Sequence, residues 1–178
     1  MHPAAAGKFV SSVEVRVLRT EDSLVFGYVL TADLSNIRIP FSVSTCRAER
    51  LWEHTCFEAF VRAKGQTGYY EFNFSPSGKW AAFAFRGYRQ RAPFEPNTSP
   101  PEITVRQTDE RLELSAKVCI DHLRLKELRV PLSLGLAAVI EDVSGRLSYW
   151  ALKHPPGKPD FHHPDSFALE IHLAGQDS

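Results

Sequence analysis

Cysteine, methionine and net charge are scarce in this chain of 178 residues, and each shortage excludes some functions. The three cysteines, Cys46, Cys56 and Cys119, are odd in number and match no zinc-ligand spacing. This pattern favours reduced thiols, so we expect a cytoplasmic protein. The 21 basic and 21 acidic side chains cancel to a formal net charge of zero. We therefore expect neither nucleic acid nor an anionic membrane surface as a partner.

Long apolar runs and targeting signals are also missing. No hydrophobic stretch is long enough to cross a bilayer as a helix, so no membrane contact is expected. The opening segment MHPAAAGKFVSS has small side chains but lacks the apolar central region of a secretory signal peptide. The length of the chain favours one domain over residues 1–178, with residues 1–8 as a flexible N-terminal segment.

Alternation of apolar and polar residues is the dominant pattern, and it indicates β-strands. It is clear in VEVRV (13–17) and in GYYEFNFSP (68–76), which a turn joins to KWAAFAFRGYR (79–89). Strands separated by short Pro, Ser and Gly turns are typical of antiparallel hairpins. We predict an all-β fold, an antiparallel two-sheet β-sandwich of jelly-roll type. One short helix is expected over residues 121–128, because Asp121 is a suitable N-cap.

The segment YWALKHPPGKPDFHHPDSFALEI (149–171) is unusually rich in proline, histidine and aromatic residues. Its four prolines fix φ and restrict the residues before them. A loop restrained in this way loses little entropy when a ligand docks, so we interpret it as the rim of a binding site. His162 and His163 should point in opposite directions, because neighbours in an extended segment diverge. The alternative is that the loop only seals the sandwich.

Metal, haem and catalytic sites have weaker support. His154, His162 and His163 match no zinc spacing, although carboxylates and loop carbonyls leave a calcium site open. Haem needs axial ligands, and this chain has no internal methionine and no CxxCH sequence. No common catalytic motif is present. Glu58 and Glu71 stand on predicted strands, where glutamates usually face water. No metal, cofactor or enzymatic activity is therefore predicted.

A polar ligand such as a sugar fits the residues better. Sugars present apolar C–H patches and a polar edge, so their sites combine flat aromatic side chains with fixed hydrogen-bonding groups. Trp52 stands at the entrance of a predicted strand, whereas Trp80 and Trp150 are equally compatible with the core. The candidate ligand-binding residues are Trp52, Glu53, Asn73, Arg86, Trp150, Phe161 and His163.

Three motifs together resemble one known superfamily. They are LWEHTCFEAFV (51–61), YYEFNFSPSGKWAAFAF (69–85) and the proline-rich segment 149–171, and they follow the same order along nearly the whole chain. The chain looks like the DOMON-like superfamily, and more narrowly like its bacterial members akin to family 9 carbohydrate-binding modules. This resemblance implies a β-sandwich that binds sugar or haem and performs no chemistry on sugar.

The resemblance also implies roles for individual residues. In the sugar-binding relatives two tryptophans clamp a terminal sugar, and Trp52 matches the first of them. Trp150, Phe161 or His163 would take the second position. Haem-binding relatives commonly use a methionine with a histidine or lysine, which this chain does not offer internally. We expect a non-catalytic domain that binds a small saccharide at one end of the sandwich. The alternatives are a haem-binding electron-transfer module and a protein-interaction domain without a small-molecule ligand.

Overall fold

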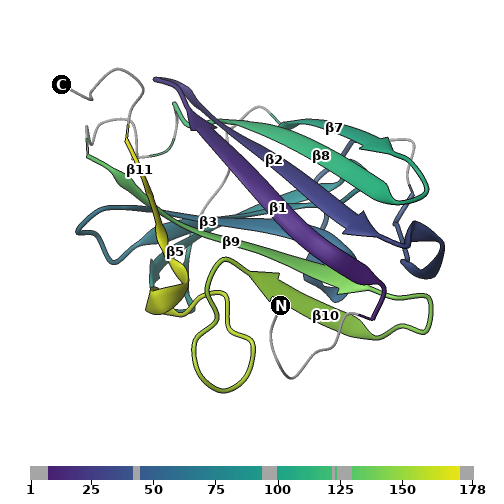
Figure 1. Cartoon of the computed structure of the whole chain (residues 1–178). Coiled ribbons are helices and arrows are strands. Elements are labelled where there is room, and N and C mark those ends of the chain that lie inside the picture. The colour runs from purple at the N-terminus through teal and green to yellow at the C-terminus, as the bar shows by residue number, and fades with distance from the viewer. Residues whose placement is uncertain (1–7, 42–44, 94–99, 122, 124–129, 173–178) are drawn as a thin grey trace.

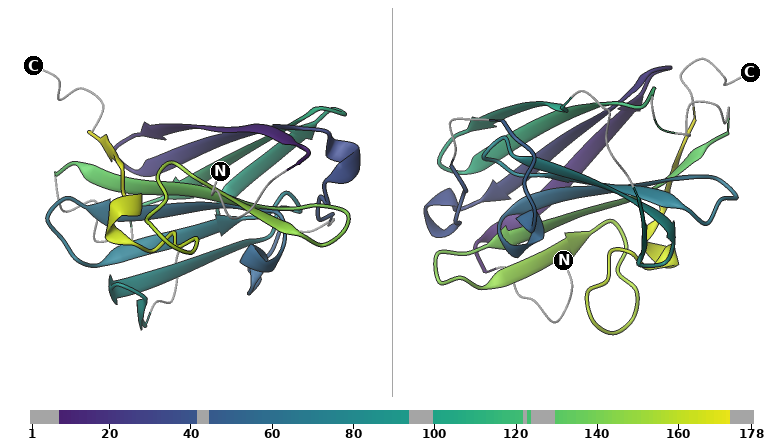
Figure 2. Two further views of the ribbon diagram at one scale, coloured as in Figure 1. Left: turned by 60° about the horizontal axis from the view of Figure 1, so that its bottom comes forward. Right: turned by 180° about the vertical axis from the view of Figure 1, so that it is seen from behind.

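The structure is a computed structural model that describes residues 8–41, 45–93, 100–121, 123 and 130–172 (Figure 1). Two antiparallel sheets pack face to face, as the three views show (Figures 1 and 2). The predicted all-β sandwich is confirmed. Within the described residues the helical segments are three short 3-10 turns, and no helix there is long and apolar enough to cross a membrane. Most of the helix predicted over 121–128 lies outside the described residues.

The smaller sheet has four strands in the order β1-β2-β8-β7. Their bounds are β1 (Val10–Arg19), β2 (Ser23–Ala32), β7 (Glu102–Gln107) and β8 (Arg111–Cys119). Alternate residues of β2 and β8, such as Phe26 and Leu114, are fully buried against the other sheet. Residues between them, such as Arg111 and Glu113, lie on the outer face. This sheet follows the alternation that the sequence predicts, because only one of its faces is covered.

The larger sheet has seven strands in the order β10-β9-β3-β4-β5-β6, and β11 also pairs with β9. Their bounds are β3 (Cys56–Ala63), β4 (Tyr69–Phe74), β5 (Trp80–Gly87), β6 (Gln90–Ala92), β9 (Leu132–Glu141), β10 (Leu147–Ala151) and β11 (Leu169–Ile171). Its inner face contributes Phe57, Phe72 and Leu134 to the core between the sheets. Burial of this apolar surface is the main stabilising contribution to the fold.

The outer face of the larger sheet is also covered, which gives the molecule a partial third layer. Phe60, Tyr69, Phe83 and Phe85 form a second apolar cluster there, against which Trp52 and other side chains pack. Strands β3, β4, β5 and β9 are therefore buried on both faces. This double burial explains why WAAFAF at the start of β5 reads as a continuous apolar run.

Two segments form the cover. One is the 3-10 turn η2 (Leu51–Glu53), which precedes β3. The other is the loop of residues 152–168, which connects β10 to β11 and includes the 3-10 turn η3 (Pro164–Ser166). Both of these strands pair with β9. Strand β10 pairs with residues 137–141 of β9, and strand β11 pairs with residues 132–134 of β9. Figure 1 shows the loop beneath the larger sheet, on the side away from β1, β2, β7 and β8.

A glycine lets the loop approach the sheet closely. Gly135 lies on the outer face of β9, and a Cβ atom there would meet the backbone oxygen of Ser166 at 3.1 Å. A larger residue would push η3 away from the sheet. Within the loop, Gly157 has a φ of 96°, which agrees with the permissive turn that glycine supplies.

Candidate functional site

A hollow of about 580 Å³ opens between the cover and the outer face of the larger sheet. Trp52 of η2 lines it on one side, and Pro159 and Phe161 of the loop line it on another. Glu58 of β3 and Glu71 of β4 reach it from the sheet below. The volume is within the range of small-molecule sites, roughly 300–1,000 Å³. The hollow therefore lies over a face of the sandwich, and not at one end as the sequence led us to expect.

The walls of the hollow are aromatic. Trp52 is partly exposed and packs edge-to-face on Phe83, with ring centroids 6.1 Å apart. Phe161 packs at a tilt on Tyr149 of β10, with ring centroids 6.2 Å apart. The guanidinium of Arg91 lies over the Phe83 ring, 4.1 Å from its centroid. The rim thus combines flat apolar surfaces with a cation, as recognition of a polar ligand with apolar patches requires.

The floor is formed by two buried carboxyl groups. Glu58 and Glu71 are 4% and 5% exposed, so the expectation that they face water is wrong. Their neighbours Phe57 and Phe72 point into the sandwich core, which turns both glutamates to the outer face. The side-chain amide of Asn73 donates to Oε1 of Glu71 at 2.8 Å. Oε1 of Glu58 and Oδ1 of Asn73 have no hydrogen-bond partner among the described residues.

Burial controls the protonation of this floor. It raises the pKa of Glu58 well above its usual range, and the nearby Glu71 raises it further. Burial also raises the pKa of Glu71, against the hydrogen bond from Asn73 and the charges of Arg91 and Arg89. Two carboxylates that share a dry site disfavour each other's ionisation. The floor therefore holds a proton more readily than exposed glutamates do.

His162 adds a neutral polar group beside the floor. The backbone N–H of Arg89 donates to the Tyr69 hydroxyl at 3.2 Å, and that hydroxyl lies 2.9 Å from Nδ1 of His162. If Tyr69 donates its proton to Nδ1, the ring hydrogen is on Nε2, which faces Oε2 of Glu71 at 3.7 Å. Burial and the charge of Arg89 lower the pKa of His162 to about 4. The ring is therefore neutral near pH 7.

Asp160 holds the loop in place over the hollow. Its carboxylate accepts hydrogen bonds from the backbone N–H of His162 at 3.1 Å and from the guanidinium of Arg89 at 2.8 Å. The Tyr88 hydroxyl donates to the same carboxylate. Ser166 donates to the backbone oxygen of Asp160 at 3.1 Å. These contacts tie the loop both to itself and to the turn between β5 and β6.

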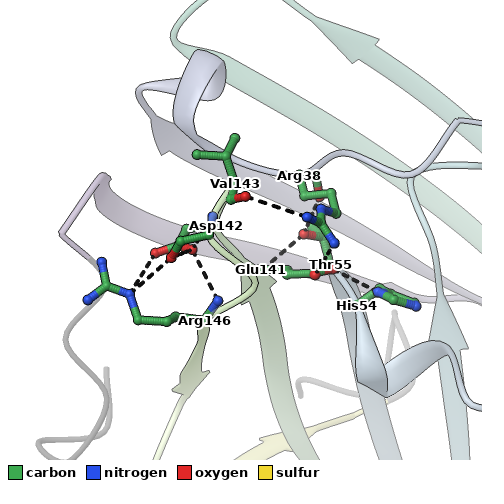
Figure 3. A network of polar contacts seen from close by, with 8 residues as sticks. Arg38, His54, Thr55, Glu141, Asp142, Val143 and Arg146 are labelled. Atoms are coloured by element: carbon green, nitrogen blue, oxygen red, sulfur yellow. Dashed lines mark hydrogen bonds and ion pairs between the residues drawn. The ribbon is translucent and has the colours of Figure 1, made fainter.

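A polar network holds the other side of the cover (Figure 3). Glu141 at the end of β9 is buried, accepts from Arg38 at 2.8 Å and lies 2.7 Å from Nδ1 of His54. The Thr55 hydroxyl donates to the backbone oxygen of Arg38 and accepts from the backbone N–H of Glu141. Because His54 and Thr55 follow η2 directly, this network fixes the turn that carries Trp52.

The structure brings together three of the residues predicted to bind ligand. Trp52, Glu53 and Phe161 all line the hollow. Asn73 is fully buried and supports Glu71 by a hydrogen bond, but it does not line the hollow. Arg86 is exposed and lies outside the lining of the hollow.

The remaining two predicted residues do not line the hollow, but the residue that precedes each of them in the sequence does. Trp150 packs against the sandwich core and donates to Ser148, whereas Tyr149 lines the hollow. His163 accepts the backbone N–H of Asp165 and caps η3, whereas His162 lines the hollow. The two histidines have different surroundings, since His162 is largely buried beside the hollow and His163 is more exposed. Side chains alternate between the two faces of a strand, so the neighbours of the core residues Trp150 and Phe57 lie on the outer face. This alternation would have identified Tyr149 and Glu58.

Comparisons with known proteins agree on the fold. No protein-family model matches the chain, and no curated protein matches it either. A solved structure of a putative carbohydrate-binding protein from Bacteroides uniformis ATCC 8492 aligns with a TM-score of 0.63 at 16% identity, over 87% of this chain and 76% of that one.

Within the part of the chain that the structure describes, no group of three or more His, Cys, Asp or Glu residues is arranged to hold a metal ion.

Family 9 carbohydrate-binding modules from Caldicellulosiruptor kristjanssonii are also similar in structure. One in complex with glucose aligns with a TM-score of 0.63 at 9% identity, over 97% of this chain and 81% of that one. Another in complex with cellotriose aligns with a TM-score of 0.52 at 7% identity, over 84% of this chain and 72% of that one. At such identities the likeness establishes fold and not function. The chain has the fold of the family 9 carbohydrate-binding modules.

Proposed function

We propose that this protein binds a small saccharide in the hollow on the outer face of the larger sheet, and that it performs no reaction on the sugar. The observation that carries the proposal is the arrangement of Trp52 and Phe161 around a floor of buried hydrogen-bonding groups. A sugar ring packs its C–H face on such aromatic walls and directs its hydroxyls to the polar floor.

Each side of the hollow contributes a different interaction. Trp52 offers a flat surface that is already partly exposed, so little rearrangement accompanies binding. Glu58 and Glu71 offer acceptors for sugar hydroxyls, and Arg91 offers a donor at the rim. The glucose and cellotriose complexes of the structurally similar modules support saccharides as the ligand class.

The three cysteines support a cytoplasmic location as part of this proposal. All three are free thiols, with Cys46 exposed, Cys56 buried and Cys119 partly buried. A protein that keeps three unpaired thiols is suited to a reducing compartment.

Calorimetric titration with a panel of neutral and charged monosaccharides and short oligosaccharides tests the proposal. We expect saturable binding of at least one saccharide with a stoichiometry of one. Binding should decrease in Trp52→Ala and stay unchanged in Phe41→Ala, which removes an exposed aromatic outside the hollow. Absence of binding across the panel, or equal binding by Trp52→Ala, would contradict the proposal.

A further inference from the structure

The charged groups around the hollow leave an excess of negative charge, and this excess favours one class of saccharide. Among the described residues, neither Glu58 nor Glu71 forms an ion pair with a lysine or an arginine. Arg89 is committed to Asp160, at 2.8 Å. The ionisable groups that face the floor or adjoin it are Tyr28, Glu53, Cys56, Tyr69, Arg89, Arg91, Tyr149, Asp160 and His162.

Counting these groups gives the hollow a negative charge when its carboxyl groups are ionised. Glu53, Glu58, Glu71 and Asp160 contribute the negative charges. Arg50, which pairs with Glu53, Arg89, which pairs with Asp160, and Arg91 oppose them, so one negative charge remains in excess. His162 is neutral near pH 7, because burial lowers its pKa to about 4. A ligand that brings a positive charge would remove the imbalance, whereas an anionic sugar would increase it.

The hydrogen-bonding groups of the floor point to the same conclusion. Oε1 of Glu58 and Oδ1 of Asn73 are buried acceptors without a donor among the described residues. Glu58 lines the hollow, whereas Asn73, which lies opposite it on β4, is not part of the lining and supports Glu71 instead. A buried acceptor without a partner costs free energy. Because Glu58 and Glu71 both line the hollow, a ligand with several donors on one atom can bind to both carboxyl groups.

We infer that the hollow selects a saccharide with a protonated amine, an amino sugar, whose ammonium group binds against Glu58 and Glu71 while its ring packs on Trp52. This inference rests on the proposed function. An ammonium group has three donors and one positive charge, so it meets both requirements of the floor. A hydroxyl has one donor and no charge, and therefore meets only part of them.

Protons should be exchanged when such a ligand binds. Burial raises the pKa of both floor carboxyls, and the charge of Glu71 raises that of Glu58 further, so the empty floor tends to hold a proton. An ammonium group lowers the pKa of the same carboxyls and displaces that proton. A neutral sugar brings no charge and should leave the proton in place.

Calorimetry near pH 7 with glucosamine, glucose and N-acetylglucosamine tests the inference. We expect glucosamine to bind at least about tenfold more tightly than glucose, which corresponds to ~1.4 kcal/mol. N-acetylglucosamine, which has no charge, should not share this advantage. Titrations in two buffers of different ionisation enthalpy should reveal proton release with glucosamine and none with glucose.

Variants at the floor complete the test. Glu58→Gln and Glu71→Gln should each reduce the preference for glucosamine over glucose, and Glu58→Gln should remove most of the proton release. Glu113→Gln, a carboxylate on the smaller sheet, serves as the control and should leave both unchanged. Thermal unfolding of each variant verifies that it is folded, and two floor variants keep the test available if one of them is not.

The failures of the two proposals are distinguishable. Binding of glucose with equal or greater affinity than glucosamine would overturn the inference and leave the proposed function standing. A glucosamine preference that survives in both floor variants would also overturn the inference, because the floor would then not be its cause. If none of the three sugars nor any other saccharide binds, the proposed function falls and the inference with it.

Discussion

Trp52 is the residue on which saccharide binding should depend most directly. It is half-buried, lines the hollow and packs edge-to-face with Phe83. Trp52→Ala should therefore weaken saccharide binding by about 1–3 kcal/mol, the range for loss of an aromatic contact at a binding site. The melting temperature should change little. Calorimetry and thermal unfolding measure the two effects, and a large loss of stability with unchanged affinity would assign Trp52 to the core instead.

His162 should make stability depend on pH. Its folded-state pKa of about 4 lies below the ordinary value of 6.5, because the buried ring is held neutral. Its contribution to stability is complete above pH 6.5 and is lost as the pH falls towards 4, because the unfolded chain then binds more protons. The shift corresponds to up to ~3 kcal/mol.

Chemical unfolding of the wild type and of His162→Gln across this pH range measures the effect. The stability advantage of the wild type over the variant should shrink as the pH falls from 6.5 to 4. The floor carboxyls titrate in both proteins, so their effect largely cancels in the difference. A difference that stays constant with pH would contradict the burial argument for His162.

Asp160 holds the loop of residues 152–168 together and attaches it to Tyr88 and Arg89. Asp160→Ala removes the hydrogen bonds from the His162 backbone, Arg89 and Tyr88 together. We expect a loss of about 1–3 kcal/mol in the free energy of unfolding, and faster proteolytic cleavage within the loop. Asp165→Ala is the matched control, because this exposed carboxylate lies in the same loop. Equal cleavage of the two variants would show that Asp160 does not hold the loop.

The elements differ in how well the sequence predicts them. Alternation predicts β1, β2 and β8 well because one face of the smaller sheet is exposed. The same reasoning fails on β3 and β4, since it assumes a wet outer face. Glu58 and Glu71 were therefore expected in water, whereas the cover formed by η2 and the loop buries them. That cover depends on long-range packing, such as the approach of Ser166 to Gly135, which no local pattern reveals.

The same limit applies to the candidate site. Trp52 and Phe161, which the unusual composition of their segments singles out, both line the hollow. Trp150 and His163 were each displaced by one residue from the side chain that lines the hollow. In an extended strand such an error of one residue reverses the face, and only pairing with a neighbouring strand fixes which face is inward.

At the scale of the whole molecule, a bound saccharide should stabilise the sandwich as a unit. The hollow is built from β3, β4, β5, β6, β9 and β10 of the larger sheet together with both segments of the cover. Unfolding of any of them would therefore destroy the site. A ligand that binds only the folded state raises the free energy of unfolding by ~2.7 kcal/mol at a concentration of one hundred times its dissociation constant.

This stabilisation should raise the melting temperature by roughly 5–10 °C for a domain of this size. Thermal unfolding with and without the saccharide identified by calorimetry measures the shift. At the same ligand concentration the shift should be much smaller in Trp52→Ala, because that variant binds more weakly.

A second hollow of about 530 Å³ lies on the outer face of the smaller sheet, beside Gly27 and Arg106. If Trp52→Ala retains the full shift while Arg106→Ala loses it, the saccharide binds there and the larger sheet is not the binding face.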